Sequence, residues 1–173
     1  EFRRVLFRSG LVMKYGPVSA KVNNKVEGLN YRVYHNKDIE FLDLTSPSGQ
    51  RTYTRTLFMV LCKAVKDLYP EGHVDIDIPV SNGYYCDMKI NVEITLEVAD
   101  RIRHRMQEII DAKMPIRRFT VPTEEAIALF QEKGDVEKVK LLRTSGSIYT
   151  TYYKIGEYVD YYYGTLLTNT SQL

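Results

Sequence analysis

The sequence is poor in cysteine and has no long apolar run. A membrane-spanning helix needs about 20 consecutive apolar residues, and no stretch approaches that length. The two cysteines, Cys62 and Cys86, cannot build a disulfide scaffold, so a reducing, cytoplasmic location is expected. These absences argue against a secreted protein, a membrane protein and a cysteine-rich zinc module.

The sequence also lacks an excess of charge of either sign. Lys and Arg number 24 and Asp and Glu number 22, which gives a net charge of +2. Such a balance provides no general attraction to nucleic acid or to a membrane surface. The 173 residues, 44% of them hydrophobic, suffice for one domain, or for one domain with a small appendage.

The common phosphate-binding and metal-binding motifs are absent as well. The sequence has no Gly-x-x-x-x-Gly-Lys-Ser/Thr loop, no Gly-x-Gly-x-x-Gly and no Cys-x-x-Cys pair. The three histidines, His35, His73 and His104, are far apart in the sequence, so a zinc site with four converging ligands is not expected. Cys62 and Cys86 are interpreted as packing residues, and a Cys-His nucleophile pair is the alternative.

The pattern of the N-terminal part predicts short strands and turns. Strands are expected over residues 19–23, 31–34 and 39–44. The pair Asn23-Asn24 predicts a turn, because Asn tolerates the left-handed region of the backbone map. The segment Ser46-Pro47-Ser48-Gly49 predicts a linker or turn.

The rest of the sequence mixes helical and extended patterns. Apolar residues recur at helical spacing, with Thr95 and Thr123 as the expected N-caps of two helices. Helices are expected over residues 52–69, 96–112, 123–133 and 136–142, and strands over residues 73–78, 84–90, 115–121, 148–155 and 158–167. This order predicts an α+β class, with helices packed on a mostly antiparallel sheet.

Neither end of the sequence looks like the natural end of a protein. Residues 1–9 resemble a translated sequencing adaptor and are expected to be a scar outside the fold. A basic N-terminal arm or the start of a targeting peptide is the alternative. Residues 169–173 show no helix cap and no charged tail. We therefore expect an internal fragment of a longer protein.

Two clusters of side chains suit nucleic-acid binding, and each has a plainer interpretation. Seven tyrosines fall near the C-terminal end: Tyr149, Tyr152, Tyr153, Tyr158, Tyr161, Tyr162 and Tyr163. They suit a base-stacking platform, but packing of Tyr-rich strands is favoured. Five arginines, Arg101, Arg103, Arg105, Arg117 and Arg118, suit phosphate contacts, but a solvated helix face is favoured.

Several segments, in one collinear order, carry a family resemblance. The runs at residues 18–25 and 38–44 resemble the second half of a TGS domain. The runs at 57–70 and 79–87 resemble the start of the second additional domain of threonyl/alanyl-tRNA synthetases, and segments at 106–110, 124–126, 138–142 and 157–160 continue the match. After the expected scar at 1–9, the resemblance implies a truncated β-rich TGS remnant at 10–45, a linker at 46–50 and a truncated editing-domain-like fold at 51–173.

The resemblance also implies where an editing site would lie. In threonyl-tRNA synthetase this domain edits mischarged tRNA with a His-x-x-x-His pair and a Cys-x-x-x-His pair. Registered on Pro70 and on Asp160 with Gly164, the four positions fall on Arg55, Met59, Tyr162 and Leu166. These side chains cannot build a zinc site or a metal-assisted hydrolytic site, so no catalytic residue and no metal are expected.

The same positions suggest a ligand site. Arg55, Asp160 and Tyr162 are candidates for holding a phosphate or a nucleobase by paired hydrogen bonds and stacking. The alternative is that Arg55 pairs with Asp160 and fills an inactive site.

A closer resemblance is to a bacterial nucleoside (uridine) kinase family. It rests on residues 17–25, 42–49, 138–147 and 160–164. It implies a P-loop kinase domain downstream of Leu173, and ATP and Mg²⁺ are expected only there. The leading hypothesis is a non-catalytic accessory region of such a kinase, with RNA or a nucleotide as ligand, the kinase domain as partner and no membrane contact. The alternatives are a tRNA-editing or aminoacyl-tRNA-binding fragment of a synthetase-like protein and a structural or dimerisation module.

Overall fold

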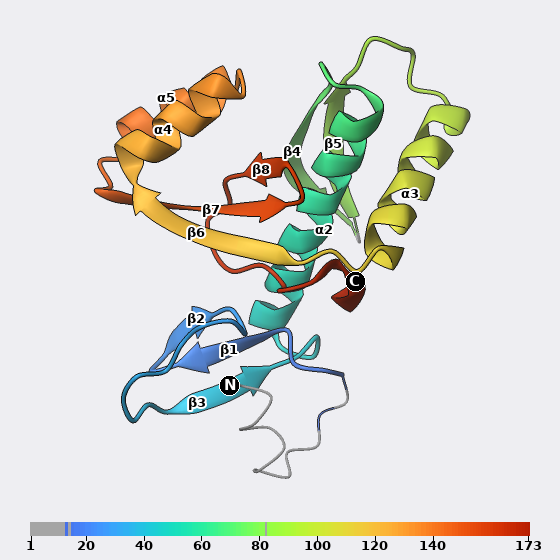
Figure 1. Ribbon diagram of the computed structural model, residues 1–173. Helices are drawn as coiled ribbons and strands as arrows, with labels where there is room; N and C mark the ends of the chain where they lie inside the picture. Colours follow the sequence, from blue (N-terminus) through green and yellow to red (C-terminus); the bar gives the residue numbers. More distant parts are fainter. Residues whose placement is uncertain (1–12, 14, 82) are drawn as a thin grey trace. The chain divides into compact units, whose positions relative to one another are not determined.

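The computed structural model describes residue 13, residues 15–81 and residues 83–173 (Figure 1). The expected scar at residues 1–9 lies outside the described residues. The chain divides into two compact units. Unit 1 contains the chain up to Met114 and returns at Thr165–Leu173, and unit 2 is Pro115–Gly164. These units do not follow the domain boundaries implied by the family resemblance, which stay predictions.

Unit 1 begins with a small antiparallel sheet in the order β2-β1-β3. Its strands are β1 (Ser19–Val22), β2 (Lys25–Glu27) and β3 (Ile39–Leu42). Asn23 and Asn24 have φ values of 45° and 68°, so the predicted left-handed turn is confirmed. The strand predicted over residues 31–34 is wrong, because this segment does not pair with a neighbouring strand. The short strand β2 was not expected.

A long helix, α2 (Pro47–Leu68), follows the first sheet. It begins at Pro47 and not near residue 52, because Ser46 is its N-cap and accepts a hydrogen bond from the Gly49 backbone N–H at 3.0 Å. Proline suits the first helical position, where its missing N–H costs nothing. The segment expected to be a linker is therefore the first turn of α2.

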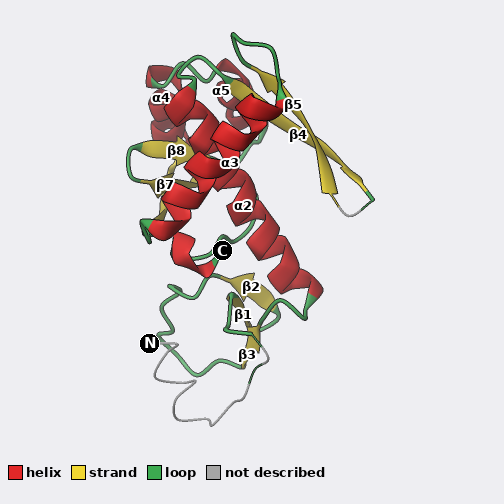
Figure 2. Ribbon diagram, turned by 90° about the vertical axis from the view of Figure 1, so that its right-hand side faces the viewer, coloured by secondary structure: helices red, strands yellow, loops and turns green. Residues whose placement is uncertain are grey.

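The rest of unit 1 is a hairpin, a second helix and a short terminal turn. The hairpin pairs β4 (His73–Val80) with β5 (Gly83–Lys89), and α3 (Leu96–Asp111) packs along α2 (Figure 2). Thr95 caps α3 as predicted, since its hydroxyl accepts from the Val98 N–H. Residues 169–173 do contain a cap, contrary to expectation. Asn169 and Gln172 form a capping box around the 3-10 turn η1 (Thr170–Gln172).

Unit 2 is a three-stranded antiparallel sheet with two helices. The sheet has the order β6-β7-β8, formed by β6 (Ile116–Pro122), β7 (Tyr149–Ile155) and β8 (Tyr158–Asp160). Helices α4 (Thr123–Glu132) and α5 (Val136–Thr144) bury Ala126, Phe130, Val139 and Leu142 against one another and the sheet. Thr123 does not cap α4. Its hydroxyl donates to the Ser147 carbonyl at 2.6 Å, and Pro122 is the N-cap residue.

The architecture confirms the α+β class. The sheets are small and antiparallel, and within the described residues they are not joined into the single larger sheet that the sequence suggested. None of the helices in the described part of the chain combines the length and the apolar character that crossing a bilayer requires.

Candidate functional site

Two of the four positions implied by the family resemblance lie on α2 of unit 1. Arg55 and Met59 are four residues apart, so they share one face of the helix. Met59 is fully buried, with an exposed fraction of 0%, whereas Arg55 is half-buried. A buried thioether at this position has no proton to give or take and makes a close-packed core contact.

The third position, Leu166, lies in the segment that returns to unit 1. Leu166 and Leu167 are buried, and this segment is fastened to α2 by hydroxyl groups. Thr52 Oγ1 and Thr165 Oγ1 are 3.2 Å apart, and the Leu167 backbone N–H donates to Thr56 Oγ1 at 2.9 Å. The chain therefore holds two apolar residues, Met59 and Leu166, in the core of unit 1 at positions where the family resemblance implies histidines.

The retained Asp160 lies in unit 2 and has its own partners there. One carboxylate oxygen accepts from the Tyr158 hydroxyl at 2.7 Å, and the other accepts from the Tyr161 backbone N–H at 2.7 Å and pairs with Lys138. The Asp160 side chain is 5% exposed. These contacts with unit 2 residues show a structural role for Asp160, and a pairing with Arg55 stays a prediction.

Lys138 is the charged centre of this cluster. Its Nζ also lies 2.9 Å from Asp135 Oδ2 and 5.9 Å from the centre of the Phe130 ring. Burial by itself lowers the pKa of Lys138, but attraction to Asp160 and hydrogen bonds to Asp160 and Asp135 outweigh it, so the pKa lies above its ordinary value. The sequence analysis did not single out Lys138 as a charged residue. A lysine that follows the N-cap Asp135 by three residues was the available signal.

Tyr162, the fourth position, is half-buried in unit 2. Arg55 belongs to unit 1, so the convergence of Arg55 and Tyr162 on one ligand stays a prediction.

The other tyrosines mostly have partners within the fold. Tyr152 stacks on Phe119 with ring centres 5.2 Å apart, and the Tyr153 hydroxyl donates to the Gly164 carbonyl at 2.7 Å. Tyr149 and Tyr163 are exposed. Packing therefore accounts for Tyr152 and Tyr153.

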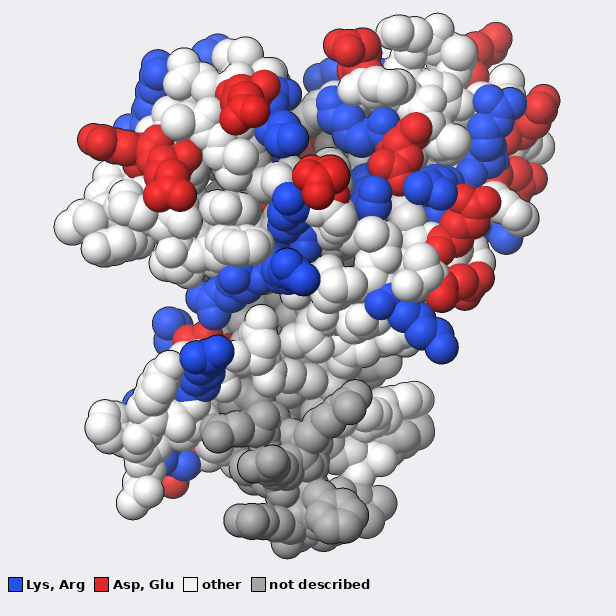
Figure 3. Space-filling view, viewed as in Figure 1, with Lys and Arg blue, Asp and Glu red and all other residues white. Residues whose placement is uncertain are grey.

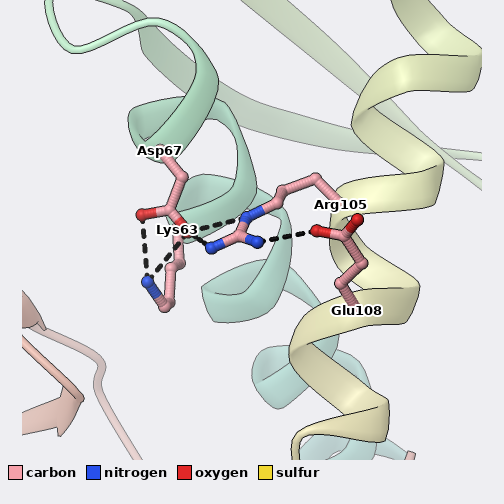
Figure 4. Close-up of polar contacts among 4 residues, drawn as sticks. All are labelled: Lys63, Asp67, Arg105 and Glu108. Atoms are coloured by element: carbon pink, nitrogen blue, oxygen red, sulfur yellow. Dashed lines mark hydrogen bonds and ion pairs between the residues drawn. The ribbon is translucent and has the colours of Figure 1, made fainter.

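The arginines of α3 pair with carboxylates. Arg105 donates to Asp67 of α2, which also accepts from Lys63, and to Glu108 one turn along α3 (Figure 4). Its hydrogen bonds to Glu108 and Asp67 raise the pKa of Arg105. Arg101 and Arg103 lie 3.6 Å from Glu97 and 3.2 Å from Asp100. Positive and negative side chains also lie side by side in the upper right of Figure 3. The pairing favours a solvated helix face over a phosphate-binding cluster.

Comparison with known proteins finds sequence similarity to threonine–tRNA ligases. No model of a protein family matches the sequence. The chain is 32% identical over 173 residues to a threonine–tRNA ligase of Clostridium tetani, covering 95% of this chain and 27% of the ligase. Threonine–tRNA ligases of Acetivibrio thermocellus (30% identity) and Syntrophotalea carbinolica (32%) match 90% of this chain and 25% of their own length.

These relatives support a threonyl-tRNA synthetase-like domain over 90% of the chain. The chain spans about a quarter of the length of the curated relatives it matches. The resemblance to a nucleoside kinase finds no support among them, so the sequence-based preference for a kinase parent over a synthetase-like protein is not upheld.

Proposed function

We propose that this chain is a tRNA-binding domain of the threonyl-tRNA synthetase type that does not hydrolyse the aminoacyl bond. The relatives are named for joining threonine to tRNA, which supports tRNA as the ligand class. The observation that carries the proposal is the burial of Met59 and Leu166, exposed by 0% and 2%, at two positions of the implied editing site.

The missing chemistry follows from those side chains. Hydrolysis of an ester needs a base, a nucleophile or a metal-bound water. A buried thioether and a buried isobutyl group supply none of these, and neither binds zinc in the way that His or thiolate does. Arg55 and Tyr162 can still contribute to binding, through a phosphate contact and base stacking.

The proposal includes a cytoplasmic location. Cys62 and Cys86 are both free, which fits a reducing compartment. It also includes the absence of bound zinc, which elemental analysis of the purified protein tests directly. One zinc per chain that survives dialysis would contradict it.

Equilibrium binding of tRNA tests the proposal. Wild-type protein is expected to retain tRNA on a filter, with affinity that falls as salt rises. Arg55→Ala is expected to weaken binding by about tenfold, the effect of one lost charged contact. Arg103→Ala is the matched control, because Arg103 is 76% exposed and paired with Asp100. Wild-type protein that binds no tRNA contradicts the proposal. Equal losses of tRNA affinity in the two variants would show that Arg55 is not part of the binding site.

A further inference from the structure

The connection between β2 and β3 has an unusual alternation of buried and exposed side chains. We call residues 28–38 the β2–β3 loop. Leu29, Tyr31 and Val33 pack on the buried residues Ala20 and Val22 of the first sheet. The residues between and after them, Asn30, Arg32 and Tyr34, are exposed. The loop is therefore anchored through one set of side chains and presents the alternate set to solvent.

Backbone contacts fix the ends of this loop. The Asn23 N–H donates to the Asp38 carbonyl at 3.0 Å, and the Asp38 N–H donates to Asn23 Oδ1 at 3.0 Å. A turn closes the other side, where the Tyr31 N–H donates to the Gly28 carbonyl at 2.9 Å. A binding group that is held in place before its ligand arrives loses less conformational freedom on binding.

Two hollows lie along the same loop. One, of about 430 Å³, is lined by residues 29–34. The other, of about 410 Å³, is lined by Asn23, Asn24, Asn36, Lys37 and Asp38. Both are open to solvent, which suits a flexible ligand laid along the surface better than an enclosed small molecule. Their linings include an exposed aromatic ring, an arginine, a lysine and several amides.

The charges around the loop leave its cations available. Glu40 lies 3.6 Å from Lys21, and Glu27 lies 2.9 Å from Lys25, so these carboxylates are neutralised by residues of the strands. Arg32 and Lys37 make no ion pair with another residue in the described part of the chain. Asp38 is the one carboxylate that lines the hollows, and it is exposed.

We propose that the β2–β3 loop binds single-stranded RNA. Tyr34 is 75% exposed and offers a face on which a base stacks, and Arg32 and Lys37 offer contacts to phosphates. The asparagine amides both donate and accept, as base edges require. The inference deepens the proposed function, because it names the part of the chain that takes an unpaired stretch of RNA, and it does not depend on Arg55 or Tyr162.

Fluorescence anisotropy with a labelled oligouridylate tests this site in the whole chain. Tyr34→Ala and Arg32→Ala are each expected to weaken binding about fivefold or more, the effect of losing one stacked base or one charged contact. Tyr34→Phe keeps the ring and should bind as wild type. Tyr85→Ala is the control, since Tyr85 is a 57% exposed tyrosine of β5. Equal melting temperatures verify that the exposed substitutions leave the fold intact.

The outcomes separate this inference from the proposed function. Wild-type protein that binds tRNA but not oligouridylate overturns the loop site alone. Binding of oligouridylate without tRNA supports the loop site and contradicts the proposed function. If Tyr34→Ala binds oligouridylate as tightly as Tyr85→Ala does, the loop is not the site. If uridine monophosphate competes as well as the oligomer at equal nucleotide concentration, the site takes a nucleotide and the RNA assignment is overturned.

Discussion

The returning segment of unit 1 and the centre of unit 2 are held by different kinds of polar contact. Unit 1 ties its returning segment in place with uncharged hydroxyls, such as that of Thr170, which donates to the Ile109 carbonyl and accepts from the Met114 N–H, both at 2.9 Å. Unit 2 centres on the pair of Lys138 and Asp160, whose side chains are 22% and 5% exposed. The comparison teaches that neutral hydroxyls hold the returning segment of unit 1, whereas an ion pair lies at the centre of unit 2. Unit 1 buries charge elsewhere, at Lys63, whose side chain is 10% exposed and pairs with Asp67.

Removing the buried cation should have the largest effect. Lys138→Met leaves Asp160 unpaired in a site with little solvent, which is expected to cost about 3–5 kcal/mol of folding free energy. Urea denaturation measures the loss. The double variant Lys138→Met with Asp160→Asn should recover a large part of it, because no buried charge is then left alone. A single variant as stable as wild type would show that the pair is not needed.

The same pair predicts a pH response that the two units do not share. The pKa of Lys138 is raised in the fold. Its contribution to the free energy of unfolding is therefore complete at pH values below the pKa of the unfolded state, and it is lost as pH rises through the pKa of the folded state. Asp75 of unit 1 behaves oppositely. The Lys89 hydrogen bond lowers the pKa of Asp75, so its contribution is present above the unfolded pKa and is lost as pH falls. Melting temperatures measured from acid to alkaline pH should fall at both extremes. Lys138→Met should make the fall at alkaline pH smaller.

Removing a buried hydroxyl from unit 1 should have an intermediate effect. Thr170 is fully buried, and Thr170→Val deletes two hydrogen bonds while keeping the shape of the side chain. The expected loss is about 2 kcal/mol, with no dependence on pH between 5 and 9, since no titrating group is involved. Thr144→Val is the control, because the exposed Thr144 hydroxyl bonds only to carbonyls of its own helix. Equal losses for both variants would refute the distinction.

The exposed ion pairs of unit 1 should matter least. Arg105→Ala breaks contacts to Asp67 and Glu108 that water can replace, since Arg105 is 36% exposed. A loss of about 1 kcal/mol or less is expected, and it should shrink as salt is added. A loss as large as that of Lys138→Met would mean that the α2–α3 contact depends on this arginine.

The local elements were largely predictable, and the long-range contacts were not. Helix α3 follows from Thr95 and the apolar spacing that comes after it, because caps and periodicity are local signals. The start of α2 was misplaced because Ser-Pro-Ser-Gly suits both a turn and a helix N-terminus. The strand expected over residues 31–34 fails because alternation alone cannot supply a pairing neighbour.

The residues of the candidate site come from the family resemblance and stay a prediction, whereas their burial comes from the fold. The resemblance located Met59 and Leu166 at two of its positions, whereas their place in the core of unit 1 depends on contacts between residues far apart in the chain. The salt bridge from Lys138 to Asp160 is hidden from the sequence for the same reason. Alignment with a family tells which side chain stands at a given position. Only the fold tells how far that side chain is exposed to solvent.

Deacylation of mischarged tRNA at protein concentrations that saturate binding tests the central claim most directly. The same sample is read for bound tRNA by filter retention and for remaining aminoacyl ester over time. The account predicts retained tRNA with an ester half-life equal to that without protein, because Met59 and Leu166 cannot activate water. Faster loss of the ester in wild-type protein, abolished by heat denaturation, would contradict it.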